Sequence, residues 1–190
     1  MLVVLSGCGD GASIPSCDSA QIDPTHRKEG TCRRNKQVLV VVNPQHTLKL
    51  RDVSVRLTAP PALDEQTYRR AGTVVYTVPL PVHNGTGRPQ RFPVSYSPGR
   101  QGQLVLQVGS HLYVEHLRLE RATRGVVPPV FVQQPPIAAG ATRDGSVVFA
   151  FGRTDLRAVA PGQLLLLATS FADAAKSKTA ERLGVIRFYN

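Results

Sequence analysis

The stretch from Thr47 to Leu57 decides the fold, and it reads TLKLRDVSVRL. Leu48 and Leu50 alternate with polar residues, and a second alternating run follows from Val53 to Leu57. Because a strand places successive side chains on opposite faces, this period of two predicts half-buried strand structure with one face toward a core.

Similar runs lie on both sides of this stretch, separated by turns rich in Gly, Pro and Asn. They fall at residues 38–42, 73–82, 91–96, 103–108, 112–114, 146–151, 164–167 and 184–189. No segment has convincing helical periodicity. About eight or nine short strands with such punctuation predict an all-β fold, an antiparallel β-sandwich. We favour a sandwich over a barrel because the longer connections suit crossovers between two sheets.

Glycine and proline positions give more local predictions. Pro79 and Pro81 indicate that the strand over 73–82 ends at a sheet edge or a bend, because proline has no backbone N–H to donate. Asp144 and Gly145 indicate a turn before the next strand. The prolines of residues 125–136 indicate an extended loop.

Composition limits the classes of protein that the chain can belong to. It has 190 residues, 42% of them hydrophobic, which suits one domain with a real core and a short tail. No apolar run reaches the ~18 residues that a membrane-spanning helix needs. The formal net charge of +10 comes from basic residues spread along the chain. A solvated basic surface or attraction to anionic lipids and polymers is therefore favoured over specific nucleic-acid binding.

The first eight residues indicate where the protein resides. Leu5-Ser6-Gly7-Cys8 resembles the bacterial lipobox, in which small side chains precede the cleavage site and the thiol after it receives the lipid. We expect residues 1–8 to be the remnant of a lipoprotein signal peptide and Cys8 to be lipidated. The apolar stretch is shorter than a complete signal peptide, so the true start codon lies upstream or the sequence is truncated. The alternative is a frayed terminus with an unmodified thiol.

The two other cysteines bracket a polar stretch without apolar periodicity. A disulfide between Cys17 and Cys32 would close a loop of about 15 residues and contribute roughly 3 kcal/mol in the chain-entropy model. Free thiols, or a metal site that includes His26, remain alternatives, although the spacing contains no CxxC pair. We expect residues 9–32 to be a tether with this cysteine-bracketed loop and residues 33–190 to be the sandwich domain.

Several motifs from Gly30 onward resemble a known family. They are Gly30-Thr31-Cys32, His46 to Leu57, Gly72-Thr73-Val74-Val75, Val82-His83-Asn84, Pro89-Gln90-Arg91-Phe92, Asp144 to Phe149 and Leu183 to Phe188. The arrangement is similar to the DUF4352-type immunoglobulin-like domains of actinobacterial lipoproteins and secreted proteins. The resemblance covers residues 31–190 and implies an immunoglobulin-like β-sandwich exported to the cell envelope, with no assigned activity.

The sequence contains no recognisable catalytic constellation. It lacks HExxH, a Gly-x-Ser-x-Gly elbow and a glycine-rich phosphate loop, and the adjacent Asp64 and Glu65 lie in a loop. Asn84-Gly85-Thr86 matches a glycosylation sequon, but a tight turn explains it. The five histidines are His26, His46, His83, His111 and His116. We therefore predict no catalytic residue, no cofactor and no metal site.

The functional prediction is a non-enzymatic, lipid-anchored cell-envelope protein that acts as an interaction or structural module. It would lie on the extracytoplasmic face of the membrane or, alternatively, be secreted. Its partner would be an envelope protein or polymer. The alternative function is a basic binder of an anionic polymer, either a cell-wall polyanion or, less expected, nucleic acid. The oligomeric state is not predicted.

Overall fold

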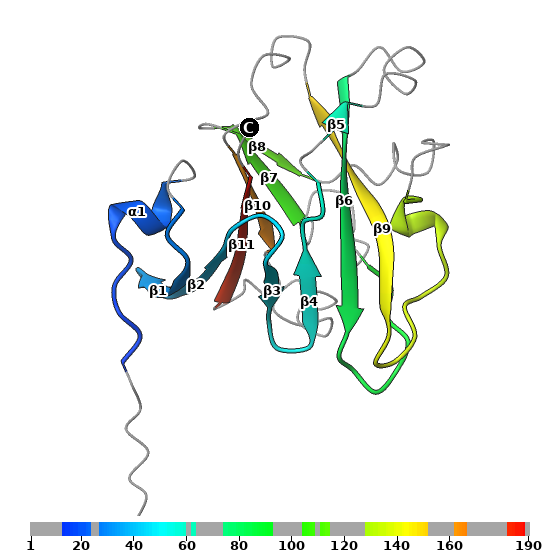
Figure 1. The fold of residues 1–190 in the computed structure, drawn as a ribbon, viewed down its shortest axis with the longest axis horizontal. Helices are drawn as coiled ribbons and strands as arrows, with labels where there is room; N and C mark the ends of the chain where they lie inside the picture. The colour runs from blue at the N-terminus through cyan, green and yellow to red at the C-terminus, as the bar shows by residue number, and fades with distance from the viewer. Residues whose placement is uncertain are drawn as a thin grey trace, which may run out of the picture.

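The computed structural model describes residues 13–23, 27–59, 62–63, 74–92, 104–108, 111–114, 128–151, 162–166 and 182–188. Almost all regular structure in this part of the chain is strand (Figure 1). The strands are β1 (Gly30–Arg34), β2 (Gln37–Val42), β3 (Thr47–Lys49), β4 (Val53–Arg56), β5 (Ala62–Leu63), β6 (Val74–Asn84), β7 (Leu104–Val108), β8 (His111–Val114), β9 (Thr142–Phe151), β10 (Gly162–Leu166) and β11 (Arg182–Phe188). Two short helices accompany them, α1 (Ser19–Ile22) and the 3-10 turn η1 (Phe131–Gln133).

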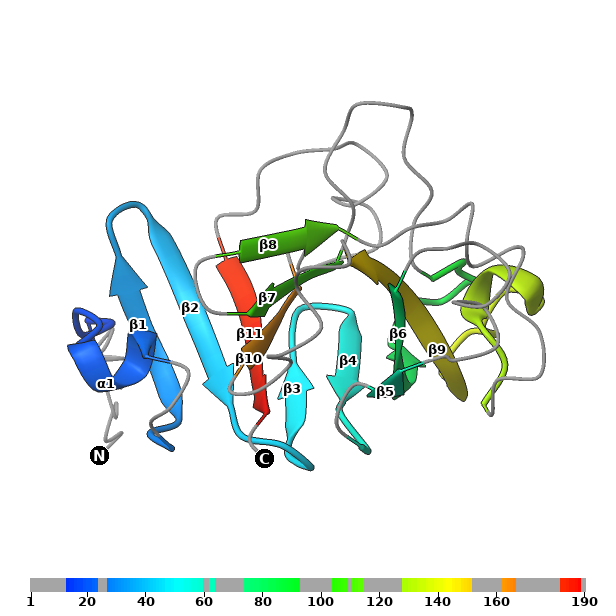
Figure 2. The same cartoon turned by 90° about the horizontal axis from the view of Figure 1, so that it is seen from above.

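The strands form two sheets that lie in separate layers (Figure 2). Sheet A has the order β1-β2-β11-β10-β7-β8. In sheet B, β3 pairs with β4, and β4, β5 and β9 all pair with β6. Because β9 runs along one edge of β6 from Val74 to His83, β4 and β5 share the other edge. The predicted all-β sandwich is confirmed.

Among the described strands, one pair is parallel and the others are antiparallel, so the prediction of an antiparallel fold is wrong at that pair. β11 pairs with β2 in parallel, from Arg182 opposite Val38 to Ile186 opposite Val42. The first long strand and the last strand thus run side by side in the same direction. The remaining order, β4-β6-β9 against β11-β10-β7 with β8 at the edge, matches that of immunoglobulin-like sandwiches.

The core lies between the two sheets and follows the predicted alternation. Leu104, Leu106 and Val108 of β7 belong to this core, as do Ile186 and Phe188 of β11. The buried residues of this shared core are Leu48, Leu50, Val53, Val55, Leu57, Val78, Leu80, Val82, Phe92, Leu104, Leu106, Val108, Phe131, Ile137, Val147, Phe149, Ile186 and Phe188.

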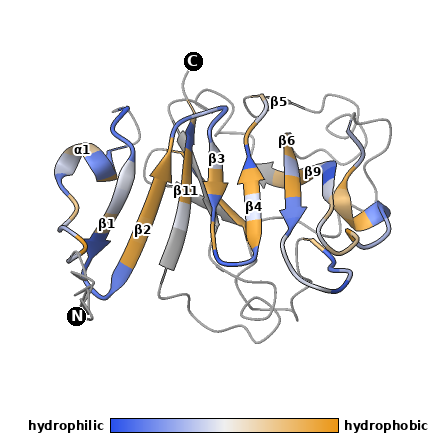
Figure 3. Cartoon of the chain, turned by 60° about the horizontal axis from the view of Figure 1, so that its bottom comes forward, coloured by the Kyte–Doolittle hydropathy of each residue, from blue (hydrophilic) through white to orange (hydrophobic). Residues whose placement is uncertain are grey.

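β2 differs from the other strands in that both of its faces are covered. Val40 and Val42 pack against the shared core, whereas Leu39 and Val41 belong to a second cluster on the outer side of sheet A. A strand buried on both sides has no reason to alternate. This explains the continuous apolar run of β2, which is visible in Figure 3.

Pro79 and Pro81 lie inside a strand with neighbours on both edges, which corrects the prediction of an edge or bend. Pro79 exposes its carbonyl to the β4–β5 edge, where the Thr58 hydroxyl donates to it at 3.2 Å. By alternation Pro81 faces the same edge. Pairing there is confined to residues 76–77 with β5 and 82–84 with β4, so both prolines fall where no backbone donor is needed.

Asp144 and Gly145 form no turn, because both lie within β9. A side chain at Gly145 would place a Cβ atom 2.6 Å from Cζ of Phe131, so glycine makes room for that ring. Phe131 belongs to η1, and its ring meets Phe92 edge-on with centroids 5.1 Å apart. The expected extended loop over 125–136 therefore contains a 3-10 turn in its described residues, 128–136.

Gly184 of β11 leaves room for two leucine side chains from the β3 side of the core. A Cβ atom there would overlap Cδ2 of Leu48 and lie 3.2 Å from Cγ of Leu48 and from Cδ1 of Leu50. Leu48 is completely buried, so its side chain has little room to move. We therefore expect Gly184→Ala to lower the free energy of unfolding by about 1–3 kcal/mol in urea denaturation.

Gly87→Ala is the matched control for this experiment, because a Cβ atom at Gly87 would meet no atom within 4 Å. Its effect should stay within about 0.5 kcal/mol. Equal stability of the two variants would contradict the proposed close contact between the sheets.

Candidate functional site

The N-terminal module comprises residues 13–23 and 27–34, and it covers the outer face of β2 and β11 in sheet A. A disulfide joins Cys17 and Cys32, in agreement with the sequence prediction and in place of free thiols or thiolate metal ligands. Two backbone hydrogen bonds of Arg33 join the same two segments. The Arg33 N–H donates to Pro15 O at 2.7 Å, and the Arg33 carbonyl accepts from Cys17 N at 3.0 Å. Cys8, the predicted lipidation site, and His26 lie outside the described residues.

The disulfide belongs to a small apolar core of its own. Cys32 is fully buried against Leu39 and Val41 of β2 and Val185 of β11, and Cys17 packs against this group. The cross-link therefore holds the module onto the β2–β11 pair.

Arg187 is the charged residue that ties the module to the sandwich. It lies in β11 next to Val185 on the outer face, and its side chain is 0% exposed. Its guanidinium donates hydrogen bonds to Lys28 O at 2.8 Å and to Ala20 O at 3.0 Å. A buried charge is costly unless hydrogen bonds compensate it, so this contact depends on the module being in place.

The helix α1 presents one of these carbonyl groups. Asp18 caps it by accepting from Gln21 N at 2.9 Å, and the Gln21 side chain accepts from Asp18 N at 3.1 Å, which forms a capping box. Lys28 forms an ion pair with Asp18. The hydrogen bonds from Lys28 and from the Gln21 backbone hold the pKa of Asp18 below its usual value.

Glu29 links the module to the start of sheet B. One carboxylate oxygen of Glu29 accepts from the backbone N–H of Asn43 and lies 2.7 Å from Nδ1 of His46. Burial raises the pKa of Glu29, but the hydrogen bonds from Asn43 and His46 outweigh it, and the charges of His46 and Arg187 act in the same direction. The net effect is a lowered pKa.

We expect Arg187→Met to destabilise the protein by about 2–3 kcal/mol, because the carbonyl groups of Lys28 and Ala20 would lose their buried donor. Faster amide hydrogen exchange over residues 15–23 would show that the module itself has loosened. Arg33→Met, at an exposed position of β1, is the control and should change stability little. Unaltered exchange in the Arg187 variant would contradict the assigned role.

The Glu29 carboxylate predicts a specific acid sensitivity. Because its folded-state pKa lies below the ordinary value of 4.5, its contribution to stability is present above that pH and is lost as the pH falls through the folded-state pKa. The free energy of unfolding, measured by urea denaturation over a series of pH values, should therefore fall less steeply below about pH 4.5 in Glu29→Gln than in the wild type. Asp18 is present in both proteins, so parallel curves would contradict the role of Glu29.

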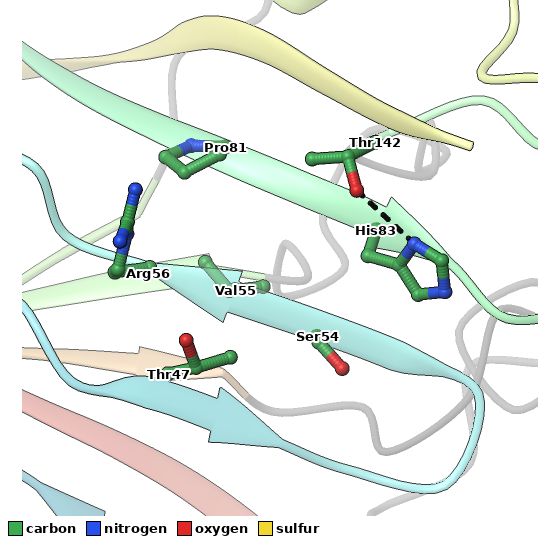
Figure 4. A pocket seen from close by; sticks show the side chains of 7 residues that line it. All are labelled: Thr47, Ser54, Val55, Arg56, Pro81, His83 and Thr142. Carbon is green, nitrogen blue, oxygen red and sulfur yellow. Dashed lines mark hydrogen bonds between the residues drawn. The ribbon is translucent and has the colours of Figure 1, made fainter. Parts of the chain in front are cut away.

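A second candidate region is a depression of about 160 Å³ on the outer face of sheet B (Figure 4). Four strands contribute to it, because outward-facing residues of β3, β4, β6 and β9 lie in adjacent register. It is lined by Thr47, Ser54, Val55, Arg56, Pro81, His83 and Thr142.

His83 has a fixed position in this depression. Its Nδ1 atom lies 3.1 Å from Oγ1 of Thr142, the residue directly opposite it on β9. Arg56 is exposed near Pro81, at the other end of the depression (Figure 4), and none of the described residues forms an ion pair with Arg56. The depression thus combines a positive charge, three hydroxyl groups and an imidazole, which suits binding of a polar anionic group.

Asn84 has a structural role that excludes glycosylation in this fold. Its side chain is 0% exposed, and Nδ2 donates to Arg88 O at 2.8 Å, Ile137 O at 3.0 Å and Ala138 O at 3.1 Å. Its Oδ1 accepts from Thr86 N and from the Thr86 hydroxyl at 2.9 and 2.7 Å. Nδ2 of Asn84, the atom to which a sugar would be attached, is therefore buried and hydrogen-bonded.

Sequence reasoning located some of these residues and missed others. It paired Cys17 with Cys32, but it did not identify Arg187, whose alternation with apolar neighbours reads as a solvent-facing position. It also missed α1, although Asp18 followed three residues later by Gln21 is a capping-box signature. His83 and Thr142 are far apart in sequence, and only the pairing of β6 with β9 brings them together.

Comparison with known proteins does not identify a family. No family model matches the sequence, and no curated protein matches it. A solved structure that the chain resembles is that of a functionally unknown protein from Listeria monocytogenes EGD-e. The sequence identity is 14%, the TM-score is 0.46, and the match covers 76% of this chain and 81% of the other. The resemblance to DUF4352-type domains therefore stays a prediction.

The described helices are α1 and η1, and neither combines the length and apolar character needed to cross a bilayer.

Proposed function

We propose that this chain is a lipid-anchored, extracytoplasmic interaction module of the cell envelope, attached through Cys8 and without enzymatic activity. The observation that carries the proposal is the disulfide between Cys17 and Cys32. Structural disulfides persist in oxidising surroundings outside the cytoplasm and are rare inside it. Its burial in the small core on sheet A supports a structural role for this bond rather than a transient redox role.

The N-terminal module also suits attachment from its amino-terminal side. The lipobox-like sequence ends at Cys8, and the cross-linked segment begins at Cys17. A tether between these residues would pass its load to the disulfide and to the Arg187 hydrogen bonds. A pulling force on the tether would then not separate the strands of the sandwich one after another.

The alternative function is binding of an anionic polymer by the basic surface. The observation that favours it is the exposed Arg56 beside the hydroxyl groups of the depression on sheet B. Lys49, which is exposed on β3 opposite Ser54, extends the same basic surface. The two functions are compatible, since an anchored module can have a polymer as its partner.

The lipid anchor predicts the mass and location of the mature protein. Intact mass spectrometry of protein from the membrane fraction should find a species that begins at Cys8 and carries lipid mass. Cys8→Ser should move the protein out of this fraction. Ser6→Ala, which keeps a small residue before the cleavage site, should leave it there. A soluble species with Met1 intact would contradict the proposal.

A further inference from the structure

We propose that the depression on the outer face of sheet B binds phosphate groups of an anionic envelope polymer, with Arg56 as its charged donor. The inference names a ligand for the interaction module, and it rests on the proposed function only in placing the polymer outside the membrane. Three features support this ligand: the positions of the donors, the balance of charge and the shape of the surface.

Donors from four strands meet in two neighbouring rows. Thr47 lies opposite Arg56 across β3 and β4, and Ser54 lies opposite His83 across β4 and β6. His83 in turn lies opposite Thr142 on β9. Neighbouring strands are about 4.8 Å apart, so adjacent donors are spaced to reach different oxygens of one tetrahedral group. Figure 4 shows these side chains around the depression, with Arg56 at one end, His83 and Thr142 at the other, and Thr47 and Ser54 between them.

The charge balance of the lining favours an anion. Arg56 is positively charged, and the seven lining residues include no carboxylate. Lys49 adds a second positive charge in the row of Ser54. The nearest acidic residue in register is Asp144, which lies on β9 opposite Pro81 and is therefore separated from Arg56 by the width of β6. A guanidinium group with free donors is well suited to phosphate oxygens.

The geometry favours phosphate over carboxylate. A planar carboxylate has two oxygens, which a single guanidinium group can satisfy by itself. A phosphate group has additional oxygens outside that plane, and the hydroxyl groups of Thr47 and Ser54 stand beside Arg56 to bind them. Thr142 holds Nδ1 of His83, so Nε2 is the ring nitrogen that remains for the ligand.

The shape of the site favours a polymer over free phosphate. The depression is shallow and lies on the broad face of a sheet, where an isolated ion would keep most of its hydration. Successive charges of a polymer can instead engage Arg56 and Lys49 in turn, and linked contacts strengthen binding without any single strong site.

The test is titration of the full chain with a purified glycerol-phosphate polymer at low salt, followed by calorimetry. Arg56→Gln should weaken binding about tenfold, because a charge-assisted hydrogen bond is lost. Arg34→Gln removes the same charge from an exposed position of β1 on sheet A, and it should weaken binding less than about twofold. Equal losses in the two variants would show diffuse attraction to the whole surface and overturn the site.

A second arm tests the chemistry of the ligand. Inorganic phosphate should bind more weakly per phosphate group than the polymer, and polygalacturonate of equal charge should bind more weakly than the phosphate polymer. Equal affinity for polygalacturonate would overturn the assignment to phosphate.

Polymer binding by the purified chain does not require the lipid, so a protein that lacks an anchor but binds the polymer contradicts only the proposed function. An anchored protein that does not bind contradicts only this inference.

Discussion

Burial of both faces of the β2–β11 pair is the constraint on which the rest of the structure depends. The inner face contributes Ile186 and Phe188 to the core shared with sheet B, where Gly184 allows the sheets to meet. The outer face would expose Val185 and a charged arginine in an apolar setting unless something covered it. The N-terminal module provides that cover, with a disulfide for the apolar part and two backbone carbonyl groups for the guanidinium of Arg187.

The outer faces of the two sheets therefore differ in what covers them. The proposed binding site lies on a part of sheet B that the described residues leave uncovered. Around β2 and β11 the outer side of sheet A is occupied by the module. On sheet B, the segment around Val130 covers the outer face of β9 at Ser146 and Val148. Beyond it, near Thr142 and His83, the same face carries hydroxyl groups, an imidazole and basic side chains. A rigid sheet that is already stabilised from its inner side can present such groups without large rearrangement.

The sequence predicted those features that depend on local periodicity, and it failed where distant contacts decide the outcome. Alternation identified the inward set of β7 and the all-β class, because side-chain period follows directly from strand geometry. Gly145 was wrongly predicted to form a turn. Its role is to leave room for the ring of Phe131, and no local sequence pattern reveals this long-range contact. Arg187 was similarly hidden, because its partners lie more than 150 residues earlier in the chain. The cysteine pair was accessible from sequence because few pairings were possible.

The parallel position of β11 also has a consequence for the order in which the protein can be assembled. β11 follows all the other described strands in the sequence and is inserted between β2 and β10. Until β11 is in place, β2 and β10 each lack one neighbour, so sheet A cannot close. Contacts between the two ends of a chain slow folding. Closure of sheet A is therefore expected to be a late step in folding, because it joins segments that are far apart in the sequence.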